Sequence, residues 1–373
     1  MDDDRSCRSD RQTAVLPEPR SMKPYQWPML VLYAAAIFSQ SKSFRDNPVI
    51  GSTRLNTMGL HLFRRRLAAR MGARRRAQLA SRITAEDRAA IDRDGYIVKR
   101  DFLDPQTFAA LRDEILGLQT HAREAVIGDT LTRLIPLDVW NLRKVPTTRT
   151  VLEGPDFNDL FAYAGSFKRR PRLFVQTVFT QVLKDAPPDV QSFFHSDTFH
   201  PTVKAWLYLD DVDPASCPFT YVPGSHLANR RRLAWERRVS FDAATSADPL
   251  TAEGSLRVTE AELARLGYAP PVSLAVGANS LVIADTSGFH KRATSADQAR
   301  RISIWAYSRS NPFLPWAGGD LTRLLPAAHS AGLHLFWFAQ DQVKRMRKAR
   351  GGWRWVGVRT PATPPVLETS SES

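Results

Sequence analysis

The sequence predicts a mainly β fold with flanking helices, an antiparallel sandwich or barrel of the jelly-roll kind. Short β-rich runs separated by Pro, Gly and Asp fill residues 130–312, and this spacing is typical of antiparallel sheets. The 373 residues are 43% hydrophobic and 24% charged, which suits a globular protein with a sizeable core. The two cysteines, Cys7 and Cys217, lie far apart, so we expect a reducing, cytoplasmic compartment.

The net charge of +14 is concentrated at the two ends of the chain. Residues 1–85 carry 16 basic and 6 acidic side chains, and residues 344–359 carry 7 basic and no acidic ones. Basic flanks favour an anionic partner surface, either phospholipid or nucleic acid. Nucleic acid is the weaker alternative, because no recognised binding module is present and the basic residues do not alternate with aromatic ones.

The N-terminal part divides into a tail and an extension. Residues 1–24 contain three prolines and are predicted to be a disordered tail, and residues 25–83 form an apolar and basic extension. The apolar run at 27–38 is too short to span a bilayer, which needs about 20 residues. It also lacks the basic start and cleavage site of a secretory signal. We interpret it as a packed helix or as an interfacial anchor.

The segment 59–82 is predicted to be a helix with an apolar stripe and a basic remainder. Leu60, Phe63, Leu67 and Met71 recur at spacings of three and four, and seven arginines occupy much of the rest. Such a helix can lie among anionic lipid headgroups, which would make the protein peripheral on the inner face of the membrane. The alternative is an arginine-rich helix that docks on its own domain.

A central domain is expected at 84–315, with a charged helical insertion at about 226–270. Its entry segment, 92–116, reads as a turn, a short strand and a helix whose N-cap is Asp104. The clearest strand candidates are 172–183, 202–212, 218–225, 273–288 and 300–309. An aromatic and basic helical segment is expected at 316–359, and its part 333–355 is a second candidate for membrane contact. Residues 360–373 are predicted to be a second disordered tail.

The run "FFHSDTFHP" at 193–201 is the strongest chemical signal. His195 and Asp197 are two residues apart, so on a strand their side chains project to the same face. A set of two histidines and one carboxylate is the signature of mononuclear non-haem iron(II) that activates oxygen. The best third ligand is His290, in "DTSGFHKRAT". We interpret His200 and His226 as groups beside the site rather than ligands.

A carboxylate-binding pair follows the distal histidine. Arg301 lies 11 residues beyond His290, and Ser303 is on the same strand face as Arg301. An arginine fork with a nearby hydroxyl suits a carboxylate at the back of a pocket.

Four features together resemble the phytanoyl-CoA dioxygenase family over about residues 84–312. They are the H-x-D motif, the run "AWLYLDDV…PFTYVPGSHL", His290 and Arg301. The resemblance implies a double-stranded β-helix core of the cupin-like kind, with Fe(II), 2-oxoglutarate and O2 as cofactor and co-substrates. It implies that His195, Asp197 and His290 ligate iron and that Arg301 binds 2-oxoglutarate. Two positions depart from the family: Arg292 stands where some relatives have a small polar residue, and Cys217 where glycine is common.

These observations predict a dioxygenase that hydroxylates an unactivated C–H bond of a lipid-like or anionic substrate. In the preferred hypothesis, the enzyme works at a membrane surface. Acyl-CoA and a lipopolysaccharide sugar would both suit the basic character. Arginines at 230–232 and 237–238 would either clamp an anionic headgroup or form a solvated helix face, and Trp206 is interpreted as core. The alternatives are a hydroxylase of a small soluble metabolite and a non-catalytic jelly roll that binds a ligand or a membrane.

Overall fold

The computed structural model describes residues 29–183, 186–214, 216–295, 297–318, 325–347 and 352–365. The tail expected at 1–24 lies outside the described residues, and so do residues 366–373 of the tail expected at the C-terminus.

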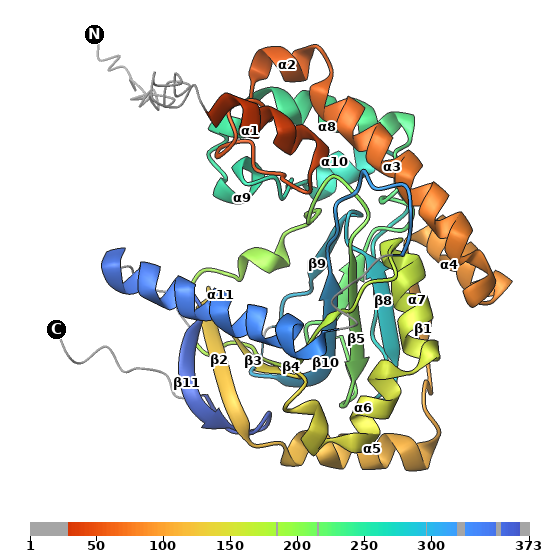
Figure 1. Cartoon of the computed structure of the whole chain (residues 1–373), viewed down its shortest axis with the longest axis vertical. Helices are drawn as coiled ribbons and strands as arrows, with labels where there is room; N and C mark the ends of the chain where they lie inside the picture. Colours follow the sequence, from red (N-terminus) through yellow and green to blue (C-terminus); the bar gives the residue numbers. More distant parts are fainter. Residues whose placement is uncertain are drawn as a thin grey trace, which may run out of the picture.

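Two antiparallel sheets form the centre of the protein (Figure 1). The eight-stranded sheet has the order β1-β8-β5-β10-β4-β3-β2-β11, and the three-stranded sheet has the order β7-β6-β9. The strands of the large sheet are β1 (Tyr96–Lys99), β2 (Thr120–Ile127), β3 (Thr130–Pro136), β4 (Arg172–Phe179), β5 (Val203–Tyr208), β8 (Leu281–Asp285), β10 (Arg300–Ser308) and β11 (Arg354–Arg359). Those of the small sheet are β6 (Phe219–Tyr221), β7 (Val272–Ser273) and β9 (His290–Arg292). The expectation of antiparallel sheets with helices around them is confirmed, in a fold that mixes α and β structure.

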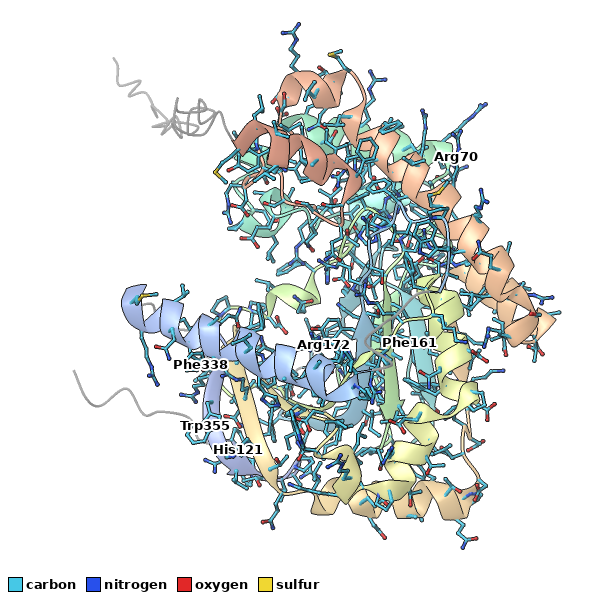
Figure 2. The ribbon with its side chains drawn as sticks, viewed as in Figure 1. Arg70, His121, Phe161, Arg172, Phe338 and Trp355 are labelled. Atoms are coloured by element: carbon cyan, nitrogen blue, oxygen red, sulfur yellow. The ribbon has the colours of Figure 1, made fainter. Side chains whose placement is uncertain are left out.

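The two faces of the large sheet differ because side chains alternate along each strand. On β5, Val203, Ala205 and Leu207 belong to the main hydrophobic core on one face, whereas Lys204 and Trp206 line a pocket on the other. The core face packs on helices that include α7 (Pro155–Gly165), whose Phe161 is labelled in Figure 2. The other helices on this side are α4 (Ala85–Asp94), α5 (Pro105–Gly117) and α6 (Pro146–Glu153). The opposite face is therefore the one available for a site.

A second group of helices gathers at one end of the sheets (Figure 1). The N-terminal helices are α1 (Leu30–Ala35), α2 (Thr53–Thr57) and α3 (Leu60–Leu79), and those from the middle of the chain are α8 (Arg230–Asp242), α9 (Pro249–Ala252) and α10 (Glu260–Arg265). Their joint core contains Phe44, Trp235 and Phe289, together with Phe194 from the segment that carries the H-x-D motif. The N-terminal extension and the helices after 226 thus fold together beside that motif.

The sequence left two alternatives for the arginine-rich helix at 59–82, and the burial of three arginines on α3 distinguishes between them. Arg64, Arg65 and Arg75 are fully buried, whereas Phe63 of the apolar stripe is 50% exposed. Burial is tolerated because backbone carbonyls accept hydrogen bonds from all three guanidinium groups, and Glu236 lies 3.5 Å from Nε of Arg65 as a counter-charge. Only the far face, represented by Arg70 in Figure 2, is exposed. The helix docks on its own domain, which is the alternative reading of the sequence.

The C-terminal segment differs from the expected helical run over 316–359. The helix α11 (Pro326–Arg347) is followed by the strand β11, which pairs with β2, and Trp355 packs on His121 with ring centroids 5.6 Å apart (Figure 2). Residues 360–365, expected to be disordered, lie against buried Arg133, which donates to the carbonyls of Thr360 and Thr363. Among the helices described, none is both long enough and apolar enough to cross a membrane.

Candidate metal centre

His195 and His290 form a backbone pair although 95 positions separate them. The amide of His195 donates to the carbonyl of His290 at 3.0 Å, and the amide of His290 donates back at 2.9 Å. This antiparallel bridge attaches the H-x-D segment to β9, and it places the two imidazole rings with centroids 4.4 Å apart. The neighbouring amide of Asp197 donates to the carbonyl of Thr286, so the turn before β9 holds the carboxylate beside both rings.

The three side chains present their ligand atoms to one another. Oδ1 of Asp197 lies 3.8 Å from Nε2 of His195 and 3.8 Å from Nε2 of His290. All three ligand atoms lie within 4.8 Å of one another, and this is the set of metal-ligating type found among the described residues. The structure therefore brings the three predicted ligands together at one point.

The hydrogen bonds of the histidines fix which ring nitrogen is free. Nδ1 of His195 donates to the carbonyl of Phe193 at 2.8 Å, and Nδ1 of His290 donates to that of Gly288 at 3.0 Å. Both Nε2 atoms are buried without a partner, which is the state expected of a metal ligand whose other nitrogen is held by a backbone carbonyl. Burial lowers the pKa of His290 to about 4 and that of His195 well below its usual value. Both rings are thus neutral, as a metal ligand must be.

Two lysines hold Asp197. The ammonium of Lys204 lies 2.7 Å from Oδ2, and that of Lys42 donates to the backbone carbonyl of Asp197 at 2.7 Å. Burial raises the pKa of the Asp197 carboxyl, but Lys204, His290 and His195 together keep the pKa well below its usual value. Because Lys204 occupies Oδ2, Oδ1 is the oxygen left to bind a metal.

A pocket of about 300 Å³ opens on the two histidines. Its lining combines aromatic side chains, amides and cations: Ile127, Thr132, Gln176, Gln191, His195, Lys204, Trp206, Phe219, His290, Lys291, Arg292, Arg301, Trp305 and Trp353. The C-terminal segment contributes Trp353, so it forms part of the pocket wall. Another pocket of larger volume, about 450 Å³, contains none of the candidate site residues.

Arg301 and Ser303 lie on the pocket face of β10 with unused polar atoms. Nε of Arg301, Oγ of Ser303 and the hydroxyl of Tyr208 are all buried without a partner. Ser303 and Tyr208 face each other across β10 and β5, and the Arg301 guanidinium lies 5.7 Å from the Tyr208 ring centroid. A carboxylate bound here would satisfy groups that the protein leaves unpaired.

The two departures from the family pattern both lie beside Arg301. The carbonyl of Cys217 accepts a hydrogen bond from Arg301, and the residue has a φ of +54°. This left-handed conformation explains why glycine is favoured at the position, although cysteine adopts it here. Arg292 lines the same pocket and forms an ion pair of 2.6 Å with Asp189, so its charge is balanced by the protein.

The remaining sequence candidates stand apart from the pocket. His200 and His226 are buried but do not line it, and His226 has no partner for either nitrogen. The arginines of 230–232 and 237–238 do not line it either, and Arg232 is buried against Glu236 at 2.7 Å. Trp206, interpreted as core, both packs on Phe219 at 4.6 Å between ring centroids and lines the pocket.

Sequence reasoning missed Lys42, Lys204 and Tyr208. Lys204 and Tyr208 flank Trp206 at alternate positions of one strand, which was a signal that they share its face. Lys42 could not be found this way, because it lies 155 residues from Asp197.

Two neutral histidines and one carboxylate around an open pocket that ends in an arginine define a class of protein, the mononuclear non-haem iron oxygenases that use 2-oxoglutarate. Comparison agrees with this class: the family model described as phytanoyl-CoA dioxygenase (PhyH) matches residues 91–265, which is slightly less than half of the chain. The matched region includes His195 and Asp197 and ends before His290 and Arg301. The protein is thus an iron- and 2-oxoglutarate-dependent oxygenase.

Several solved structures are similar to the chain. The epimerase SnoN, solved with Fe³⁺, α-ketoglutarate and nogalamycin RO, is 19% identical, with 62% of this chain and 83% of that chain covered and a TM-score of 0.39. HygX from Streptomyces hygroscopicus, with nickel and 2-oxoglutarate, is 18% identical, with coverages of 60% and 86% and a TM-score of 0.36. EctD from S. alaskensis, with bound Fe, is 14% identical, with coverages of 64% and 82% and a TM-score of 0.36. No curated protein matches the sequence.

Proposed function

We propose that the protein hydroxylates an unactivated C–H bond of a lipid-like or anionic substrate. In this proposal, His195, Asp197 and His290 ligate Fe(II), and Arg301 with Ser303 binds the distal carboxylate of 2-oxoglutarate. The observation that carries the proposal is the pair of buried, unpartnered Nε2 atoms beside Oδ1 of Asp197. A non-catalytic jelly roll would have no reason to keep these three atoms free and adjacent, because unpaired buried polar groups cost stability.

The strand order supports a double-stranded β-helix as the finer description of the fold. From β4 onward, the chain passes from the large sheet to the His195 bridge on the small sheet, and then to β5 on the large sheet. It returns to the small sheet for β6 and β7, and then alternates through β8, β9 and β10. The bridge extends the small sheet beyond β9, so four segments face four strands of the large sheet. We place the metal at the end of this paired arrangement, where His195 and His290 meet.

The protein's own residues would act by holding and orienting. Bound iron and 2-oxoglutarate supply the oxidising chemistry that cleaves a C–H bond with O2. Arg301 would fix the orientation of 2-oxoglutarate through its fork of donors, and Ser303 and Tyr208 would add hydroxyl hydrogen bonds. Phe219 packs on His290 with ring centroids 5.5 Å apart, so the side of the site that it covers is apolar and excludes water.

Anaerobic reconstitution tests the proposal. The purified protein receives Fe(II) and then 2-oxoglutarate, and a visible charge-transfer band should appear with a rise in melting temperature. On admission of oxygen, succinate should form. His195→Ala should lose the metal and the band, whereas His121→Ala, on the distant strand β2, should keep both. If the wild-type protein forms neither the band nor succinate, the proposed oxygenase function is refuted and the binding-protein alternative holds.

Arg301→Met separates the two halves of the site. Iron affinity should persist, because Arg301 does not touch the three ligands, while 2-oxoglutarate affinity should fall by at least tenfold. A charge-assisted hydrogen bond contributes about 1.5–3 kcal/mol, and each 1.4 kcal/mol corresponds to a factor of ten. Unchanged 2-oxoglutarate binding in this variant would contradict the assignment of Arg301.

We further propose that peripheral contact with an anionic membrane, on its cytoplasmic side, is made by α11 rather than by 59–82. On α11, Leu335, Phe336, Phe338 and Met346 are each more than half exposed, whereas much of the basic surface of α3 is buried. Exposed apolar side chains on a helix with basic residues favour the headgroup layer. Phe336→Ser with Phe338→Ser should abolish sedimentation with anionic liposomes. Equal sedimentation of this double variant and the wild type would refute the assignment.

A further inference from the structure

The pocket is longer than its co-substrate. On β10, Arg301, Ser303, Trp305 and Tyr307 share one face, and Lys204 of β5 stands opposite Tyr307. Arg301 and Tyr307 are six residues apart on β10, which corresponds to about 20 Å along the strand. 2-Oxoglutarate, with its five-carbon chain, would extend from Arg301 to the metal and cover only part of this distance. The part that remains, from Trp305 to Lys204, is free for the substrate.

The charges of the pocket do not balance when Fe(II) and 2-oxoglutarate are placed in it as proposed. Four cations line the pocket, namely Lys204, Lys291, Arg292 and Arg301. Arg292 is paired with Asp189 and Lys291 with Glu260. The distal carboxylate of 2-oxoglutarate neutralises Arg301.

With iron bound at Asp197, Lys204 would lack a counter-charge. The two charges of Fe(II) are matched by Asp197 and by the carboxylate of 2-oxoglutarate next to the keto group. Lys204 would then lose most of the charge compensation that its ion pair with Asp197 provides. Its ammonium has three donors, of which one is used by Oδ2 of Asp197, and its side chain is 23% exposed towards the pocket. A partly buried cation without a counter-charge is costly, so an anion at this point would be bound favourably.

The walls between the two ends are aromatic. Trp206 and Trp305 face each other across β5 and β10, and Trp353 and Phe219 complete this part of the lining. Rings of this kind contact flat apolar groups over a large area. We propose that the substrate carries one anionic group, a carboxylate or a phosphate, bound by Lys204, and an apolar body that packs on Trp206 and Trp305. This inference rests on the proposed function, which places Fe(II) at Asp197 and 2-oxoglutarate at Arg301.

Binding of three matched probes tests the inference without turnover. The protein is loaded with Zn(II), which has no redox chemistry, and with saturating 2-oxoglutarate. Calorimetry then measures the affinities of 2-naphthoate, 2-naphthyl phosphate and the neutral 2-naphthylmethanol. At least one anionic probe should bind about tenfold or more tightly than the alcohol, because one charge-assisted hydrogen bond contributes about 1.5–3 kcal/mol. The tighter of the two anions identifies the source of the charge.

Variants locate the preference. Lys204→Met should abolish the discrimination between anion and alcohol, Lys204→Arg should keep it, and Lys144→Met, exposed on another face, should leave it unchanged. Metal content is measured for each variant, because Lys204 also touches Asp197. Equal affinity of wild-type protein for all three probes would overturn the inference, and so would displacement of 2-oxoglutarate by the anionic probes. Failure of the proposed function shows separately, as the absence of 2-oxoglutarate binding to the iron-loaded protein.

Discussion

Replacing Arg65 by Met should both destabilise the protein and weaken its hold on metal. The guanidinium of Arg65 is 1% exposed and donates to the carbonyls of Phe199 and His226, each at 2.7 Å. Its Nε also lies 3.5 Å from Glu236, which keeps Arg232 and His61 as partners when Arg65 is lost. Breaking one member of a buried ionic network costs about 3–5 kcal/mol, because the acceptors stay buried without a donor.

Urea denaturation followed by tryptophan fluorescence measures this loss as a lower midpoint at unchanged slope. The neighbouring Arg66→Met is the matched control: it removes the same charge from the same helix, but Arg66 is exposed, so its cost should stay within about 0.5 kcal/mol. Phe199 lies two residues after Asp197, so Arg65→Met should also lower Zn(II) affinity severalfold while Arg66→Met leaves it unchanged. Equal stability and equal metal affinity of the two variants would refute the view that α3 supports the metal site.

Three further outcomes are expected. Burial lowers the pKa of His226 to about 4 and that of His200 to about 3, so the unfolded chain takes up protons that the folded protein excludes. The two neutral rings make their full contribution to the free energy of unfolding above about pH 6.5, and this contribution is lost as the pH falls. At pH 5 each ring should cost about 2 kcal/mol relative to pH 7. The unfolding free energy of His226→Gln should therefore fall by about 2 kcal/mol less over this range than that of the wild type, and an identical fall in both would count against it. Trp353→Ala should weaken 2-naphthoate binding by about tenfold without changing 2-oxoglutarate affinity, since Trp353 lies on the substrate part of the wall; a loss of 2-oxoglutarate binding would show that the wall is assigned incorrectly. Arg133→Met should cost about 3–5 kcal/mol in urea denaturation, because it leaves buried Glu124 unpaired and frees residues 360–365, whereas exposed Arg143→Met should be near neutral.

The sequence was sufficient where the signal is local. His195 and Asp197 are recognisable because their spacing of two matches the side-chain period of an extended segment. His290 and Arg301 were candidates from their own local sequence, and the family pattern was needed to connect them to His195, since no spacing rule links positions 95 residues apart. The structure brings the predicted ligands together, and the assignment of iron to them stays a prediction until it is measured.

The failures have physical causes that involve long-range partners. Helical periodicity gave α3 its position but not its orientation, because the carbonyls that receive Arg64 and Arg65 come from elsewhere in the fold. The strand β11 was not predicted, because its aromatic and basic composition suggested a helix. The run "WRWVGVR" nevertheless alternates between apolar and basic residues at its start and follows a glycine pair. The role of Lys204 depends on a tertiary contact, because the turn at Thr286 places Asp197 beside it.

The reciprocal backbone hydrogen bonds between His195 and His290 have a consequence for how the protein acquires its metal. Both histidines are held by backbone hydrogen bonds that involve no ion, so little conformational entropy remains to be lost on coordination. Such a pre-organised pair can bind several divalent ions, and selection among them then depends on ligand type, on geometry and on which ion the cell supplies. Metal exchange in the purified protein should accordingly proceed without unfolding, with nearly the same circular dichroism spectrum in the absence of metal and with each ion bound.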